Sequence, residues 1–250
     1  GPVARWLAVS FLVVLLFISF VPQLGVVLAS VGKGWALTPF PVHYTLDYFR
    51  QVSIETPKFI VNSLMFSGLA VLMCLVIGVP MAWIMSRTQA PGRGAMDALT
   101  TLILAIPGTA VGIAYIRAFH YPLPGLDLAL TSTWFVLPLV LAVRRLPYTV
   151  RGSFSSLVLV HKSMEEAAEN VGATKLVTFR DITAPMVWKG ILVGALFSFI
   201  MSIQEASATL FLVLGGWEMI PIGIFTYYIA GSHGQAAALG VILIVLCAVS

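Results

Sequence analysis

One carboxylate lies inside a long apolar stretch near the C-terminal end of the sequence. Glu205 is the only ionisable residue in the run 190–214. A charged group inside a bilayer is costly, so such a residue is a functional hypothesis by default. Ser202, Gln204 and Ser207 lie close by in the sequence, and we expect one helix to turn this polar group toward the protein interior. Either these four residues line a substrate pathway, or Glu205 makes a structural hydrogen bond to a neighbouring helix.

A second group of chemically active residues lies in the charge-rich segment 144–189. This segment contains seven of the fourteen Lys and Arg residues and four of the ten acids. Within it, Ser163 followed by Glu166 is an S-x-x-E capping box, in which each side chain binds the other's backbone N–H. The spacing predicts a short helix that begins at Met164.

A second short helix is expected directly after the first. Gly172 can end the first helix in a left-handed conformation, and Thr174 can cap the next one. Pro185 should end this second helix, because proline lacks the N–H that a helix interior requires. Apolar residues at a spacing of three should share its face: Leu176, Phe179 and Ile182. The resulting elbow either packs on the protein's own inner loops or docks on another protein.

Other kinds of chemistry have little support in the sequence. The histidines are scattered and share no metal-ligand spacing: His43, His120, His161 and His233. The sequence contains no H-E-x-x-H pair and no G-x-x-x-x-G-K-[ST] phosphate loop. Cys74 and Cys247 lie in apolar runs and are interpreted as small buried apolar residues. We therefore predict no catalytic residue, no metal site and no cofactor in this chain.

The composition indicates the environment of these residues. Hydrophobic residues make up 59% of the 250 and charged residues 10%, with a mean hydropathy of +0.99. A soluble domain carries roughly 25% charged residues, so this chain lacks the polar surface that a soluble protein of its length needs. The sequence predicts an all-α membrane protein.

At about 20 residues per crossing, the chain has room for about six transmembrane helices. Kink-forming residues such as Pro107 and Pro138 lie inside some of these runs, either as ordinary kinks or as flexible points along a pathway. The last run holds about 15 residues and is still apolar at Ser250, so either the polypeptide continues or this helix is incomplete. The expected spans are 7–29, 59–85, 96–119, 126–143, 190–214 and 235–250.

The basic residues predict the orientation of these spans. With the N-terminus inside, ten Lys and Arg residues lie on the inner side and four on the outer side. Because basic residues concentrate in cytoplasmic loops, both termini and the elbow should be cytoplasmic. We divide the chain into a first helix with its outer loop, residues 1–58, and a core, residues 59–250.

The elbow contains a recognisable motif. Glu166-Ala167-Ala168 is followed at fixed spacing by Gly172, Ile182 and Pro185, in the pattern E-A-A-x3-G-x9-I-x2-P. This pattern resembles the EAA loop of binding-protein-dependent ABC importer permeases, with Ala184 where that family usually has Leu. The segments 145–151 and 209–212 are similar to the branch that transports ferric iron, polyamines, thiamine or phosphonates.

The resemblance implies the type I ABC importer permease fold and a bacterial inner-membrane location. It implies partners: ABC ATP-binding subunits that carry ATP and Mg²⁺, a second permease subunit or half, a periplasmic or lipid-anchored substrate-binding protein, and membrane lipid, with no nucleic acid. The chain would then be a transport subunit and no enzyme. The residues implied to couple to the ATPase are Glu165, Glu166, Ala167, Ala168, Gly172, Ile182 and Pro185.

The substrate and the class of transporter have alternatives. Ferric iron is the first substrate candidate, and aminoalkylphosphonate, polyamine or thiamine are the others. A secondary transporter without an ATPase partner would be expected to pair more charges inside its spans, and it would leave the EAA spacing unexplained. A membrane-embedded enzyme would need a catalytic cluster within the spans, which the sequence lacks.

Overall fold

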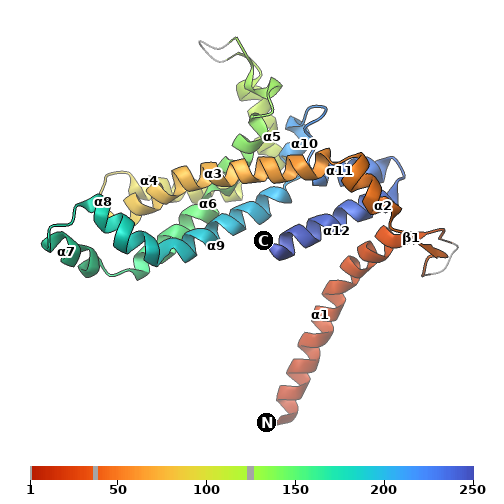
Figure 1. Ribbon diagram of the computed structural model, residues 1–250, viewed down its shortest axis with the longest axis horizontal. Helices are drawn as coiled ribbons and strands as arrows, with labels where there is room; N and C mark the ends of the chain where they lie inside the picture. Colours follow the sequence, from red (N-terminus) through yellow and green to blue (C-terminus); the bar gives the residue numbers. More distant parts are fainter. Residues whose placement is uncertain (1, 36–38, 123–126) are drawn as a thin grey trace. The chain divides into compact units, whose positions relative to one another are not determined.

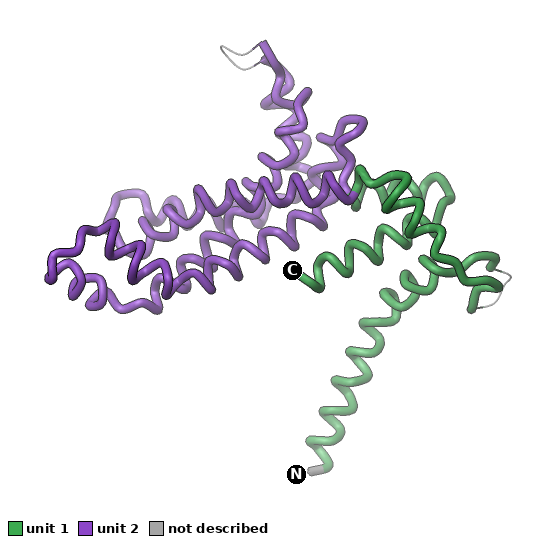
Figure 2. The backbone as a smooth tube through the Cα atoms, in the orientation of Figure 1, with its two compact units in different colours: residues 1–59, 220–249 green, residues 60–219, 250 purple. Residues whose placement is uncertain are grey.

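A computed structural model describes residues 2–35, 39–122 and 127–250. In these residues all regular secondary structure is helical except for one short antiparallel ribbon (Figure 1). The chain forms two compact units, residues 1–59 with 220–249 and residues 60–219 with 250, which Figure 2 colours separately. The predicted all-α architecture is thereby confirmed.

The first unit combines the N-terminal helix with the last two helices. α1 is apolar and exposed along most of its length, as expected of a helix that faces lipid. Side-chain hydrogen bonds join the N-terminal part of this unit to its last two helices. The Thr56 and Tyr227 hydroxyls lie 2.9 Å apart, and Gln235 Nε2 donates to Gln51 Oε1 at 2.8 Å. Its elements are α1 (Pro2–Val31), β1 (Gly32–Lys33), β2 (His43–Tyr44), α2 (Asp47–Arg50), a π-helical turn (Gln51–Glu55), α11 (Ile220–Ile229) and α12 (His233–Val249).

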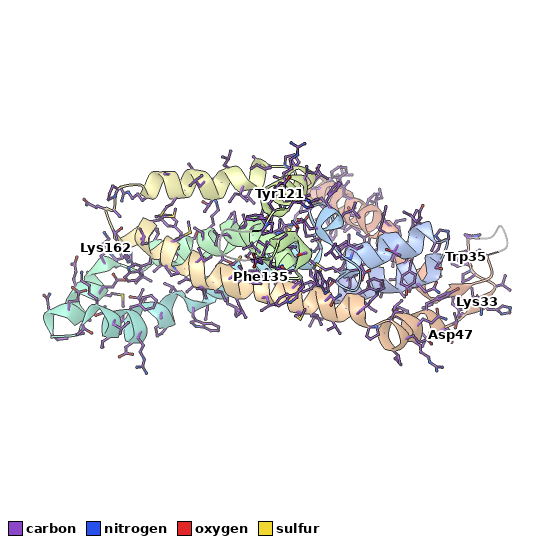
Figure 3. All side chains as sticks on the ribbon, turned by 90° about the horizontal axis from the view of Figure 1, so that it is seen from above. Lys33, Trp35, Asp47, Tyr121, Phe135 and Lys162 are labelled. Carbon is purple, nitrogen blue, oxygen red and sulfur yellow. The ribbon has the colours of Figure 1, made fainter. Side chains whose placement is uncertain are left out.

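The second unit holds all the candidate functional residues. Its core is formed by apolar side chains of α3 and α6, among them Phe66, Leu137 and Leu141. Figure 3 shows the side chains on these helices. The unit's elements are α3 (Lys58–Arg87), which begins in the first unit, α4 (Arg93–Ala105), α5 (Gly108–Phe119), a 3₁₀ turn (Leu130–Ser132), α6 (Val136–Leu159), α7 (Lys162–Asn170), α8 (Lys175–Thr178), a π-helical turn (Phe179–Thr183), α9 (Ala184–Ile203) and α10 (Thr209–Leu212).

Glycines allow α6 and α9 to pack closely. Gly190 and Gly194 of α9 form a G-x-x-x-G pair that faces Gly152 of α6. A Cβ atom at Gly194 would lie 2.9 Å from the Tyr148 carbonyl oxygen, and one at Gly152 would lie 2.8 Å from Gly194 Cα. Small residues let helix backbones approach in this way inside membranes, where packing drives association.

Three helices of the described chain are long and apolar enough to cross a membrane: α1, α3 and the continuous helix Lys175–Ile203. A fourth span results if α4 and α5, which meet at a bend of 109°, are counted as one. The difference from the six expected runs lies in α6, which carries three arginines, and in α12, which has 17 residues.

The fourth and fifth predicted spans have the wrong boundaries. The predicted start of the fourth, residue 126, lies outside the described residues, and α6 begins at Val136. α6 does not end at residue 143 but continues through Arg144 and Arg145 to Leu159, because both guanidinium groups find a carboxylate partner. The fifth run is split, since α9 ends at Ile203.

Candidate functional site

The elbow begins two residues earlier than the capping box predicts. α7 starts at Lys162 after His161, and no side chain caps its first N–H groups. Ser163 therefore lies inside the helix, and the predicted start at Met164 is wrong. The chain before α7 is held in another way: Arg87 at the end of α3 donates from Nη2 to the Val160 carbonyl oxygen at 2.9 Å.

The turn inside the elbow follows the sequence prediction. Gly172 has φ of +94°, a left-handed conformation that glycine adopts without steric cost. Its N–H donates to the Glu169 carbonyl oxygen at 3.0 Å, which closes the end of α7. Thr174 then caps α8, because its Oγ1 accepts a hydrogen bond from the Val177 N–H at 3.4 Å. The predicted roles of Gly172 in ending the first helix and of Thr174 in capping the second are confirmed.

The predicted end of the second short helix at Pro185 is wrong. α8 passes through the π-helical turn Phe179–Thr183 directly into α9, so residues 175–203 form one continuous helix. Pro185 lies in the first turn of α9, where its missing N–H is tolerated because the α-helical bonding pattern restarts there. The elbow is thus rigidly joined to a helix that is long and apolar enough to cross a membrane.

A largely buried ion pair fixes the elbow to α3. Arg87 Nε lies 3.1 Å from Glu165 Oε1, and the same oxygen accepts a hydrogen bond from Thr183 Oγ1 at 3.0 Å. Nearby, the Trp83 and Phe179 rings meet edge to face with their centroids 5.1 Å apart. Glu165 therefore anchors α7 to α3 and to the start of α9.

The opposite face of the elbow is open. Ala168 is buried beneath α7, and Ile182 is half-buried. At the tip, the apolar side chains of Val171 and Leu176 are 86% and 76% exposed. Leu176 therefore does not pack with Phe179 and Ile182 as the spacing of three suggested. The exposed residues of the implied coupling set are Glu166, Ala167, Gly172 and Pro185.

Glu205 lies in a helix break. α9 ends at Ile203 and α10 begins at Thr209, so the expectation of a helix continuing through Glu205 is wrong. Glu205 closes the break itself: its Oε1 accepts hydrogen bonds from Ser207 Oγ at 2.6 Å and from the Ala208 N–H at 3.1 Å. This local bonding competes with the helix for the same backbone groups.

Two arginines of α6 bind the other carboxylate oxygen. Glu205 Oε2 lies 3.2 Å from Arg144 Nε and accepts a hydrogen bond from Arg145 Nη2. The Glu205 side chain is only 3% exposed. With two guanidinium groups and one carboxylate, this buried cluster carries one surplus positive charge. Arg144 and Arg145 are the site residues that the sequence reasoning missed, although an intramembrane carboxylate calls for a cationic partner.

The other pathway candidates do not all converge on this cluster. Ser207 joins it through its bond to Glu205, and Ser202 is buried in the last turn of α9, whereas Gln204 is exposed. α5 approaches the break from the other side, where a Cβ atom at Gly112 would lie 2.8 Å from the Ala208 carbonyl oxygen. Among the described residues, no three His, Cys, Asp or Glu side chains gather as a metal site would require.

Comparison with known proteins identifies the family. Residues 74–250, more than two thirds of the chain, match the family described as the binding-protein-dependent transport system inner membrane component. This chain belongs to that family. The matched region contains both the elbow and the Glu205 cluster, so the EAA resemblance and the permease fold are confirmed together.

Curated relatives in this permease family differ in what they are named for. The ferric transport system permease protein FbpB of Actinobacillus pleuropneumoniae is 28% identical over 82% of this chain. The molybdenum transport system permease protein ModB of Escherichia coli is 32% identical over 75% of this chain and 87% of its own length. The sulfate transport system permease protein CysT of Salmonella typhimurium is 32% identical over 55% of this chain. The chain spans 29% of the length of FbpB and 52% of CysT.

Solved structures share the permease fold. A bacterial alginate ABC transporter, in complex with its alginate pentasaccharide-bound periplasmic protein, superposes with a TM-score of 0.74 at 17% identity. The match covers 98% of this chain and 91% of that chain. An amino acid ABC transporter with histidines superposes with a TM-score of 0.58 at 18% identity, over 82% of this chain. The type I importer permease fold is confirmed.

Proposed function

We propose that this chain is the transmembrane permease subunit, or part of one, of a binding-protein-dependent ABC importer. The observation that carries this proposal is the elbow: a firmly anchored turn of helix that exposes Val171 and Leu176. A short elbow cannot bury these side chains on itself, and their exposure suits docking into a cleft of an ATP-binding subunit. ATP and Mg²⁺ would be held by that partner.

The connection between the elbow and the membrane supports a coupling mechanism. Because residues 175–203 form one continuous helix, a displacement of the elbow moves α9 with it as a rigid body. Its far end reaches the break at Glu205, where Arg144 and Arg145 hold the chain. The ion pair of Arg87 with Glu165 transmits the same displacement to α3. Closure of the ATP-binding subunits would thus change the packing around the Glu205 cluster.

We further propose how this subunit is oriented in the membrane and which proteins it assembles with. The elbow and both termini would lie on the cytoplasmic side of a bacterial inner membrane, which the excess of basic residues near the elbow supports. The pathway would form between this chain and a second permease subunit or half, and substrate would arrive on a periplasmic or lipid-anchored binding protein. The complex named for alginate includes such a periplasmic protein.

Ferric iron is the proposed substrate, supported by the 82% of this chain that aligns with the ferric permease FbpB. In this proposal Ser202, Gln204, Glu205 and Ser207 contribute to the pathway. An oxyanion such as molybdate or sulfate is the second candidate, because the Glu205 cluster carries surplus positive charge. Cellular uptake of radiolabelled ferric iron, molybdate and sulfate separates the two.

Co-purification tests the coupling role. In a tagged chain expressed with its cognate ATP-binding subunit, Leu176→Asp should reduce the recovered subunit more than tenfold, since it places a charge in the apolar contact. Leu46→Asp is the matched control, because Leu46 is 69% exposed and lies outside the elbow. Full recovery of the ATP-binding subunit by the Leu176→Asp chain would refute the proposal.

A further inference from the structure

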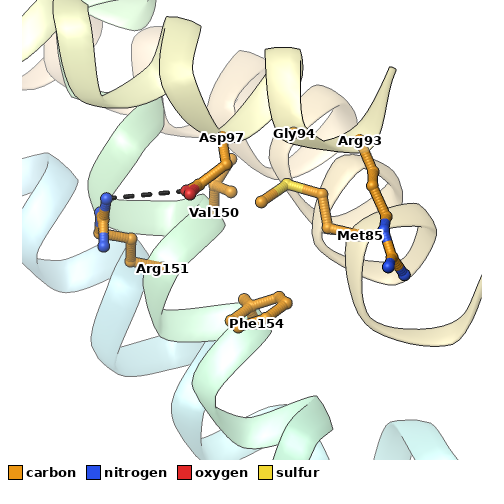
Figure 4. Close-up of a pocket in the computed structure, with 7 residues that line it drawn as sticks. All are labelled: Met85, Arg93, Gly94, Asp97, Val150, Arg151 and Phe154. Carbon is orange, nitrogen blue, oxygen red and sulfur yellow. Dashed lines mark ion pairs between the residues drawn. The ribbon is translucent and has the colours of Figure 1, made fainter. Parts of the chain in front are cut away.

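A cavity separate from the elbow and from the Glu205 cluster lies among α3, α4 and α6. It has a volume of about 300 Å³ and opens to the surface (Figure 4). The cavity combines charged and apolar walls, and its lining residues are Met85, Arg93, Gly94, Asp97, Val150, Arg151 and Phe154. Nothing in the coupling mechanism uses it.

The charges around the cavity favour an anion. Arg93 and Arg151 line the cavity together with one carboxylate, Asp97, which leaves one surplus positive charge; Arg93 donates to the Thr88 carbonyl oxygen at 3.2 Å. Arg151 Nη2 lies 3.7 Å from Asp97 Oδ1 and donates to Thr101 Oγ1 at 2.7 Å. A guanidinium group has five N–H donors, so both arginines keep donors for a further acceptor. The Arg151 and Asp97 side chains are 54% and 57% exposed, so this pairing is weak and easily exchanged.

The space between the two arginines is apolar. Figure 4 shows Arg151 and Arg93 on opposite sides, with Met85 and Phe154 between them. Val150 forms the buried floor. In front of Gly94 the space is open, since a Cβ atom there would meet nothing within 4 Å. A ligand that fits must therefore carry an anionic group and an apolar body.

The position of the cavity identifies such a ligand. Met85 lies two residues before Arg87, which binds the elbow, so the cavity lies at the same end of α3 as the elbow. If the elbow is cytoplasmic, as in the proposed function, the cavity lies at the cytoplasmic surface of the bilayer. Basic sites between helices at this level bind the headgroups of anionic lipids.

We propose that this cavity binds an anionic phospholipid, with the charged headgroup at the arginine side chains that edge the cavity and the acyl chains along Met85 and Phe154. The proposed function supplies only the leaflet in which the lipid would lie. Binding itself rests on the cavity and its charges. Asp97 then competes with the phosphate for Arg151.

Lipid retention by the purified full-length chain tests this site. In neutral detergent, native mass spectrometry should show phosphatidylglycerol retained at least tenfold more than phosphatidylcholine. The double variant Arg93→Gln/Arg151→Gln should lose most of this preference, at about fivefold per arginine. The double variant Arg50→Gln/Arg117→Gln removes the same charge elsewhere and should retain the preference.

Two further variants separate a lipid site from an internal ion pair. Asp97→Asn removes the competing carboxylate and should increase phosphatidylglycerol retention several-fold. Gly94→Leu fills the open space without changing any charge and should reduce retention. The proposal is overturned by equal retention of the two lipids, by unchanged retention in the arginine variant or Gly94→Leu, or by no increase in Asp97→Asn.

Competition and co-purification exclude other occupants. Soluble glycerol phosphate should not displace the lipid, because it lacks acyl chains; complete displacement would indicate a free-phosphate site instead. Loss of the ATP-binding subunit from the arginine variant, without any lipid preference in the native chain, would indicate a protein interface and refute the proposal. Retention of lipid by a chain that binds no ATP-binding subunit would refute the proposed function alone.

Discussion

The buried carboxylate at Glu205 gains its stability from neighbours rather than from water. An ion inside a low-dielectric interior is tolerated only where paired charges and hydrogen bonds replace its hydration. Glu205 has both, since Arg144 and Arg145 bind one oxygen while Ser207 and the Ala208 N–H bind the other. The cluster therefore fixes α6 to the end of α9.

Replacement of Glu205 measures this contribution. Glu205→Gln leaves two buried guanidinium groups without a counter-charge, and breaking a buried pair in this way costs about 3–5 kcal/mol. We expect a clearly lower Tm in thermal unfolding of the detergent-solubilised chain. Glu169→Gln, which removes an exposed carboxylate from α7, should unfold at the native temperature.

A second substitution checks the cause of that loss. Glu205→Gln combined with Arg144→Gln restores the native net charge of the cluster and should recover part of the lost stability. If Glu205→Gln alone unfolds like the native chain but no longer supports uptake, the carboxylate acts in the pathway and its structural role is refuted.

Single residues were predictable where the reason is local. Gly172 could be identified because a helix end needs a left-handed residue there, and Thr174 because a cap lies next to the N–H that it binds. The partners of Glu205 could not be identified, because Arg144 lies 61 positions earlier in the chain and only the packing of α6 on α9 brings them together. The capping box failed because Arg87, also distant in sequence, holds the chain before α7.

At the scale of elements, the continuity of residues 175–203 matters most. The sequence suggested a stop at Pro185, but a π-helical turn allows the helix to pass it. Likewise α6 was predicted to end before Arg144, since charges usually mark the end of a span. Both errors have one cause. Contacts with residues distant in the sequence stabilise the helical backbone and the buried charges at positions where the local sequence predicts that a helix ends.

The close packing of α6 on α9 gives a test at this scale. Gly194→Leu places a side chain where even a Cβ atom would lie 2.9 Å from the Tyr148 carbonyl oxygen. Such overpacking costs about 1–3 kcal/mol, and we expect a lower Tm by circular dichroism in detergent. Gly68→Leu on α3 is the matched control, because a Cβ atom at Gly68 meets nothing within 4 Å. Equal stability of the two variants would show that α6 and α9 do not depend on close approach.

For the whole molecule, composition alone was enough to predict a helical membrane protein, but it overestimated how regular the spans are. Hydropathy detects α1 and α3 because each is one uninterrupted helix. It cannot detect the bend of 109° between α4 and α5 or the break after α9, since broken spans remain apolar. Such breaks are tolerated in membranes only where the protein itself satisfies the freed backbone groups, as Glu205 does for the Ala208 N–H.

The orientation of the chain in the bilayer determines on which side of the membrane the elbow can bind an ATP-binding subunit. In a chain whose two cysteines are replaced by alanine, Val171→Cys lies on the elbow and Tyr44→Cys in β2, and both native side chains are exposed. If α3 crosses the bilayer, these positions lie on opposite sides. A membrane-impermeant maleimide should label Val171→Cys at least tenfold faster in inside-out vesicles than in intact spheroplasts, and Tyr44→Cys with the opposite preference. The reverse pattern would place the elbow outside and refute ATPase coupling, whereas labelling of both from one side would refute α3 as a span.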